Sequence, residues 1–112
     1  MVTSTQSRLF GSRRRTEVLL TIALLGETYP AELARLLGAP LYSVQNIVSA
    51  LDGEGVVASR ISGRARVVSL DPRYFAYREL KAVLLRLAEA EPDLRAIASS
   101  RRSRPRRAGK PL

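Results

Sequence analysis

The sequence contains no cysteine and no histidine, and these two absences exclude several kinds of chemistry. The chain can form no disulfide, no thiolate nucleophile, no zinc ribbon and no imidazole general base. The acidic residues are spread along the chain, apart from Glu89, Glu91 and Asp93, and this group is typical of a solvated helix end. We therefore expect no metal ion and no other cofactor.

The features of a nucleotide-binding enzyme and of a membrane segment are also missing. Gly53 and Gly55 are close together but precede a strand-like segment, which reverses the strand-to-helix order of a phosphate-binding turn. No run approaches the roughly 20 consecutive apolar residues of a membrane span, and residues 1–7 lack the apolar core of a signal peptide. We expect a cytoplasmic, nucleoid-associated protein that is not an enzyme.

Positive charge is abundant and unevenly distributed. The 112 residues carry a formal charge of +9, and six of the 19 basic residues lie in residues 101–112, which contain no acidic residue. That segment is also almost free of apolar side chains, so it is typical of disorder. We expect a flexible N-terminus at residues 1–8, one domain at residues 9–99 and a disordered basic tail at residues 100–112.

The apolar periodicity predicts three helices in the first half of the chain. The first begins near Arg13, with Ser12 or Gly11 as its cap, and ends at Gly26. The second has Pro30 at its start, where the missing N–H costs nothing. The third places its apolar residues at helical spacing and its polar residues on other faces. The predicted ranges are 13–25, 31–37 and 41–51.

The second half of the chain predicts a hairpin followed by more helix. Two β-branched runs at residues 56–61 and 65–70 surround the turn Ser62-Gly63-Arg64. An amphipathic helix follows at residues 74–90, and a shorter helical piece at residues 93–99. The fold class we expect is mostly α with a small β-hairpin wing, which is a winged helix-turn-helix with an additional C-terminal helix.

A family resemblance depends on the order and spacing of these segments. The run from Glu32 to Gly38, the apolar residues Val44, Val48 and Leu51, and the run from Glu54 to Val57 resemble winged-helix regulators of the ArsR and MarR type. The segment from Leu9 to Arg15 is similar to the opening of such domains, and the likeness covers roughly residues 9–87. Many ArsR-type repressors sense metals through Cys and His, so this chain resembles a regulator without that function.

The resemblance implies a set of DNA contacts. The residues expected to read bases are Leu41, Tyr42, Gln45 and Asn46. Gln and Asn are able to pair bidentately with adenine, and Leu or Tyr to contact a thymine methyl. The residues expected on the DNA backbone, or with the wing in the minor groove, are Arg13, Arg14, Arg15, Ser43, Ser49, Arg60, Arg64 and Arg66. For the arginines at 13–15, a solvated helix entry is the alternative.

The resemblance also implies a homodimer that represses transcription and contacts its partner through the long C-terminal helix. The residues expected in this interface are Tyr77, Leu80, Val83, Leu84 and Leu87. Packing of the same helix against the first helix of its own chain is the alternative. A second function class is a winged-helix protein-interaction module, or an antitoxin-like accessory subunit, with only non-specific DNA affinity. The aromatic residues Tyr74, Phe75 and Tyr77 are expected to pack, with a small-molecule effector site as the alternative.

Overall fold

The computed structural model describes residues 8–103, and this part of the chain forms five helices and one three-stranded sheet. The elements are α1 Arg13–Leu25, β1 Glu27–Thr28, α2 Pro30–Leu37, α3 Leu41–Gly53, β2 Val57–Ser62, β3 Ala65–Leu70, α4 Tyr77–Ala88 and α5 Pro92–Ser103. The mostly helical fold with a β-hairpin wing confirms the predicted fold class. The predicted flexible N-terminus, apart from Arg8, and the tail beyond Ser103 lie outside the described residues.

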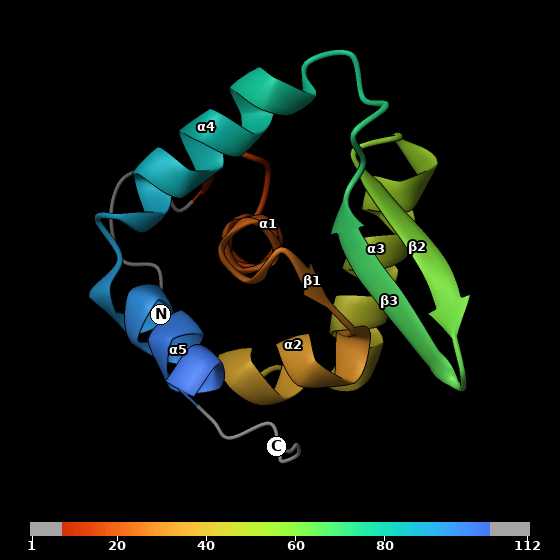
Figure 1. Ribbon diagram of the computed structural model, residues 1–112, viewed down its shortest axis with the longest axis horizontal. Coiled ribbons are helices and arrows are strands. Elements are labelled where there is room, and N and C mark those ends of the chain that lie inside the picture. The colour runs from red at the N-terminus through yellow and green to blue at the C-terminus, as the bar shows by residue number, and fades with distance from the viewer. Residues whose placement is uncertain (1–7, 104–112) are drawn as a thin grey trace.

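Helix α1 forms the centre of the molecule. In Figure 1 it is seen nearly end-on, with α4, α5 and α2 around it and the sheet and α3 beyond. Residues 16–23 of this helix are all buried, which explains why its apolar residues cover such a broad face. Its start is fixed by Ser12, whose hydroxyl oxygen accepts a hydrogen bond from the Arg15 N–H at 3.0 Å. The other elements therefore pack around a helix whose central residues are fully enclosed.

The sheet has the strand order β1-β3-β2, and both pairings are antiparallel. The hairpin pairs Val57 with Leu70 at its base and Ser62 with Ala65 at its tip. Strand β1 was not predicted, because two residues are too few to show an alternating pattern. It pairs Glu27 with Ser69, and so connects the end of α1 to the base of the wing.

The turn between α2 and α3 depends on a glycine. Gly38 ends α2 in the left-handed conformation with φ at 63°. The Ala39 N–H donates to the Ala34 carbonyl at 2.9 Å, which closes the turn in the manner of a Schellman motif. A residue with a Cβ is strained at this φ, so the glycine sets the angle at which α3 leaves α2.

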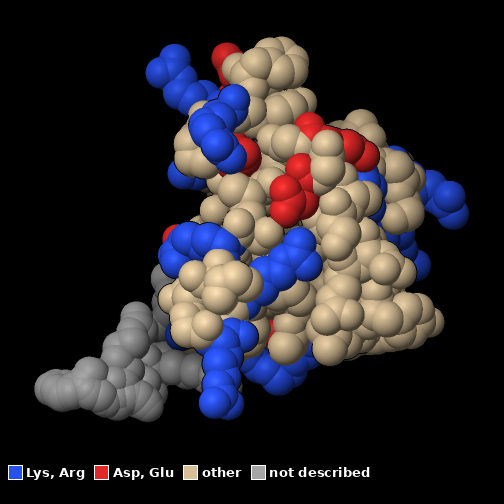
Figure 2. Space-filling model, turned by 90° about the vertical axis from the view of Figure 1, so that its right-hand side faces the viewer, with Lys and Arg blue, Asp and Glu red and all other residues tan. Residues whose placement is uncertain are grey.

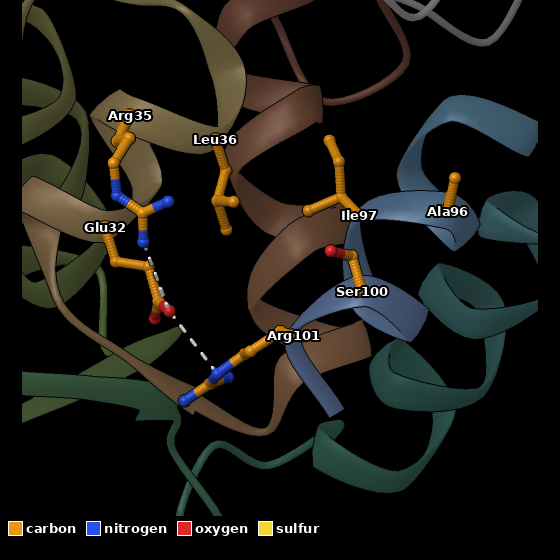
Figure 3. Close-up of a pocket in the computed structure, with 7 residues that line it drawn as sticks. All are labelled: Glu32, Arg35, Leu36, Ala96, Ile97, Ser100 and Arg101. Atoms are coloured by element: carbon orange, nitrogen blue, oxygen red, sulfur yellow. Dashed lines mark ion pairs between the residues drawn. The ribbon is translucent and has the colours of Figure 1, made fainter. Parts of the chain in front are cut away.

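Helix α5 runs through Ser103, so the predicted boundary of a tail at residue 100 was wrong. The physical reason is a tertiary contact, shown in Figure 3, in which Arg101 of α5 points toward Glu32 of α2. Arg101 Nε lies 3.4 Å from Glu32 Oε2, and the other carboxylate oxygen accepts from the Thr28 hydroxyl at 2.6 Å. Because Glu32 is buried, its charge needs these partners. The contact borders a pocket of about 260 Å³ between α2 and α5.

The wing ends at Asp71, which holds the turn toward α4. Its carboxylate accepts hydrogen bonds from the Arg73 backbone N–H at 2.9 Å and from Arg73 Nε and Nη2 at 3.2 Å each. The side-chain hydrogen bonds from Arg73 are the main reason that the pKa of Asp71 lies below its ordinary value, and the backbone hydrogen bond acts in the same direction.

This lowered pKa predicts a pH dependence of stability. A carboxylate with a lowered folded-state pKa contributes stability above its unfolded pKa and loses it as the pH falls through the folded pKa, here below about pH 4. Asp71→Asn should therefore reduce stability at neutral pH and reduce the further loss on acidification. Urea denaturation between about pH 3 and pH 7 measures both effects. If the variant loses as much stability on acidification as the unmodified chain, other carboxylates account for that loss.

Candidate nucleic-acid interface

Helix α3 presents a polar face next to a fully buried apolar face. Val44, Val48 and Leu51 are completely buried, as their helical spacing predicts. The four residues predicted to read bases lie together on the opposite, exposed face, where Tyr42 is 70% exposed and Leu41 is 44% exposed; the other two are Gln45 and Asn46. Positions three and four residues apart on a helix are neighbours, so these side chains form one continuous surface. Of the predicted backbone contacts on this helix, Ser49 is exposed and Ser43 is half-buried.

The three wing arginines have different environments. Arg64 lies in the turn of the hairpin, is exposed, and has no ion pair among the described residues. Arg60 Nη2 lies 3.0 Å from Glu27 Oε2 on β1, and Arg66 Nη2 lies 3.6 Å from Asp52 Oδ2 on α3. Only Arg64 of the three is therefore available to a phosphate without giving up an internal partner.

The arginines at the start of α1 divide in the same way. Arg13 is exposed and has no ion pair within residues 8–103. Arg14 Nη1 donates to Glu17 Oε1 at 2.9 Å and to the Leu37 carbonyl at 3.4 Å. Arg15 Nη2 donates to Glu54 Oε1 at 2.5 Å. Arg14 therefore ties α1 to the end of α2, and Arg15 ties α1 to the end of α3.

Figure 2 shows the side of the molecule that carries α3 and the wing, and its charge is mixed. Lys and Arg side chains are interspersed with Asp and Glu side chains, with a group of acidic side chains near the upper centre. The sequence analysis missed the acidic partners of the predicted contacts, which are Glu17, Glu27, Asp52 and Glu54. These residues are 3 to 39 positions away from their arginines, and no sequence signal marks the distant ones.

The comparisons with known proteins agree with this geometry. No family model and no curated protein matches the sequence. Among solved structures, wild-type MarR from E. coli in its apo form is 19% identical with a TM-score of 0.58, and the match covers 86% of this chain and 70% of the MarR chain. A cysteine-to-serine variant of MarR gives 17% identity, a TM-score of 0.59 and coverage of 85% and 69%. The same variant in complex with operator DNA gives 19% identity, a TM-score of 0.56 and coverage of 85% and 66%.

This protein has the winged-helix fold of MarR. The resemblance to regulators of the MarR type, predicted from the order of the segments, is thus confirmed at the level of the fold. In the terms of that fold, α2 and α3 are the two helices of the helix-turn-helix, and the β2–β3 hairpin is the wing.

Helix α4 divides the predicted dimer contacts between core and surface. Leu84 is fully buried against the core of its own chain, so its assignment to the interface was wrong. Val83, its neighbour, is 41% exposed. Three further residues are partly buried against the same core, namely Tyr77, Leu80 and Leu87. The apolar pattern of α4 is thus largely explained by packing within the winged-helix domain, and Val83 is the most exposed apolar side chain of the predicted set.

The aromatic cluster after the wing does not pack as a unit. Phe75 is 91% exposed, and the ring of Tyr74 lies 5.1 Å from it. Tyr77 instead turns inward and borders a small hollow between α1, β3 and α4. Within residues 8–103, no group of three or more acidic residues is arranged to hold a metal ion. No described helix combines the length and the apolar character needed to cross a membrane.

Proposed function

We propose that this protein binds double-stranded DNA in a sequence-specific manner and regulates transcription, with α3 in the major groove. The observation that carries the proposal is the exposed face of α3, on which Leu41, Tyr42, Gln45 and Asn46 form one surface while the opposite face is completely buried. A helix of this kind fits the width of the major groove. The likeness of the fold to a MarR variant in complex with operator DNA supports binding to DNA.

The chemistry of this face favours A·T base pairs. The amides of Gln45 and Asn46 match the N6 and N7 groups of adenine, while Leu41 and the Tyr42 ring suit the thymine methyl. Helix α3 contains no Arg or Lys, which are the commonest readers of guanine. We therefore propose an A·T-rich half-site and a protein that acts on the nucleoid in the cytoplasm, without enzymatic activity.

In this proposal, the affinity for DNA comes from contacts between arginines and DNA phosphates. The exposed, unpaired Arg13 and Arg64 are the first candidates for these contacts within the described residues. Arg14, Arg15 and Arg60 contribute less, because each first has to leave a carboxylate within 4 Å. Arg66 would contribute only after leaving Asp52. In this proposal, Ser49, which is exposed, and Ser43, which is half-buried at the start of α3, donate hydroxyl hydrogen bonds to the DNA backbone.

The proposal includes a homodimer. Val83 would lie at the centre of the interface, because its own chain leaves it exposed, and the parts of Tyr77, Leu80 and Leu87 that the core leaves uncovered would contact the partner around it. Two recognition helices related by a two-fold axis would read an approximate palindrome with half-sites one helical turn apart. Occupation of such a site near a promoter gives repression.

Selection of bound fragments from a random duplex library at about 150 mM salt tests the function directly. The expected result is enrichment of a palindromic, A·T-rich motif by the full chain. Enrichment of no motif, together with a stable complex with another protein, would instead favour the protein-interaction module. The salt concentration is fixed because phosphate contacts make every affinity depend on it.

Arg64→Ala should weaken binding to every duplex by a similar factor, because phosphate contacts carry no sequence information. The slope of log affinity against log salt should become about 0.9 less steep, which is the value of one phosphate contact. Titrations at several salt concentrations measure the slope. Arg95→Ala, which removes an exposed arginine from α5, is the control and should leave the slope unchanged. A slope that stays the same in the Arg64 variant would remove the wing turn from the phosphate contacts.

A further inference from the structure

Asp52, in the last turn of α3, contacts both strands of the wing through a single oxygen atom. Its Oδ2 accepts a hydrogen bond from the Ser59 hydroxyl of β2 at 2.8 Å. The same Oδ2 lies 3.6 Å from Arg66 Nη2 of β3. Among the described residues, the side-chain hydrogen bond and the ion pair that connect α3 to the wing both involve Asp52. One carboxylate thus joins α3 to both β2 and β3, the two strands of the wing.

The register of the hairpin explains why Arg66 takes part and Arg60 does not. Ser59 pairs with Val68, and Ile61 pairs with Arg66, so these four side chains share one face of the wing. Val68 is fully buried, which shows that this face is directed toward the body of the domain. Arg60 pairs with Val67 on the opposite face and reaches Glu27 instead. Of the two arginines on the strands of the wing, Arg66 is therefore the one directed toward α3.

The two ion pairs of the wing differ in exposure as well. The side chains of Arg60 and Glu27 are 58% and 60% exposed, so their pair is screened by solvent and contributes little to rigidity. The side chains of Arg66 and Asp52 are 33% and 42% exposed, and the Ser59 hydrogen bond adds to their contact. The Asp52 cluster is thus the firmer of the two connections between the wing and the rest of the domain.

We propose that Asp52 is a positioning residue for DNA recognition, which fixes the wing at a set distance from the recognition helix and keeps Arg66 in that joint and off the DNA phosphates. This inference rests on the proposed function, because the joint matters only if α3 and the wing contact one duplex together. Asp52 therefore controls two properties. It sets the spacing between the bases read by α3 and the backbone touched by Arg64, and it limits the number of phosphate contacts of the wing.

The test compares three variants of the full chain. In Asp52→Asn, the amide oxygen still accepts from Ser59 but no longer holds Arg66 by charge. We expect Arg66 to move to a phosphate, so that the loss of affinity between about 50 and 200 mM salt becomes about 3.5-fold larger. The ratio of the affinity for the selected site to the affinity for random duplex should fall. Arg66→Gln alone should leave the salt dependence unchanged. The double variant should return to the salt dependence of the unmodified chain.

Asp93→Asn is the matched control, since it removes one negative charge from an exposed position on α5 and should not alter the salt dependence. Two results would overturn the inference. One is an Asp52→Asn variant in which both the salt dependence and the preference for the selected site over random duplex are unchanged. The other is an Arg66→Gln variant whose salt dependence becomes less steep by the value of one phosphate contact. Arg66 lies at the surface of the wing, so its variant remains informative if Asp52→Asn does not fold. Failure of the unmodified chain to bind any duplex would instead reject the proposed function itself.

Discussion

Replacing Gln45 and Asn46 together by alanine is expected to reduce discrimination between the selected site and random duplex by about 30-fold or more for each half-site, since each bidentate pair contributes about 1–3 kcal/mol. Both side chains are exposed on α3, so their loss leaves no cavity, and alanine is favourable in a helix. Binding to random duplex should persist, because the arginines that contact phosphates remain.

The measurement is the dissociation constant for both duplexes at one salt concentration. Ser49→Ala on the same helix is the matched control: as a backbone contact it should lower both affinities by a similar factor. A uniform loss of affinity in the double variant would show that Gln45 and Asn46 do not read bases, and would direct attention to Leu41 and Tyr42.

Leu84→Ala is expected to destabilise the domain by about 2–5 kcal/mol, because the substitution removes apolar contacts and leaves a cavity beside α1. This is a large part of the roughly 5–15 kcal/mol that stabilises a typical domain. Leu84 is completely buried in the described chain and belongs to the same core cluster as Leu20 and Ile22 of α1. Urea denaturation at neutral pH gives the change in the free energy of unfolding.

The adjacent Val83 is the matched control and separates the two roles of α4. Val83 is 41% exposed, so Val83→Ala should change the stability of the monomer little. Val83→Asp should shift the proposed dimer toward monomer in sedimentation velocity, since it places a charge in an apolar contact. Equal destabilisation by Leu84→Ala and Val83→Ala would contradict the division of α4 into a core face and an accessible face.

Local signals in the sequence predicted the helix-turn-helix and the hairpin well. Ser12 and Gly26 delimit α1 as expected, and Pro30 and Gly38 delimit α2. The cause is local in each case, because caps, glycine turns and the apolar period act within a few residues of the position that they specify. The polar face of α3 follows from the same apolar period, since Val44, Val48 and Leu51 bury one side of the helix in the core and leave the other side exposed.

Contacts between distant segments were not predictable in this way. Strand β1 exists because Glu27 and Thr28 meet β3, about 40 residues later in the chain. Helix α5 extends to Ser103 because Arg101 meets the buried Glu32, and the local composition predicted a tail there. A short strand or a polar helix end carries too little local information to reveal a partner that only folding supplies.

The sequence by itself therefore determined the kind of domain and the face of α3 that stays exposed, because hydrophobic periodicity and turn chemistry are properties of neighbouring residues. Only the tertiary structure decided which arginines are available. Arg64 and Arg66 look equivalent in the sequence, yet the first is exposed without an ion pair among the described residues and the second is joined to Asp52. The physical reason is that an ion pair depends on distance in space, and the fold brings Asp52 to one of these arginines and leaves the other in the turn.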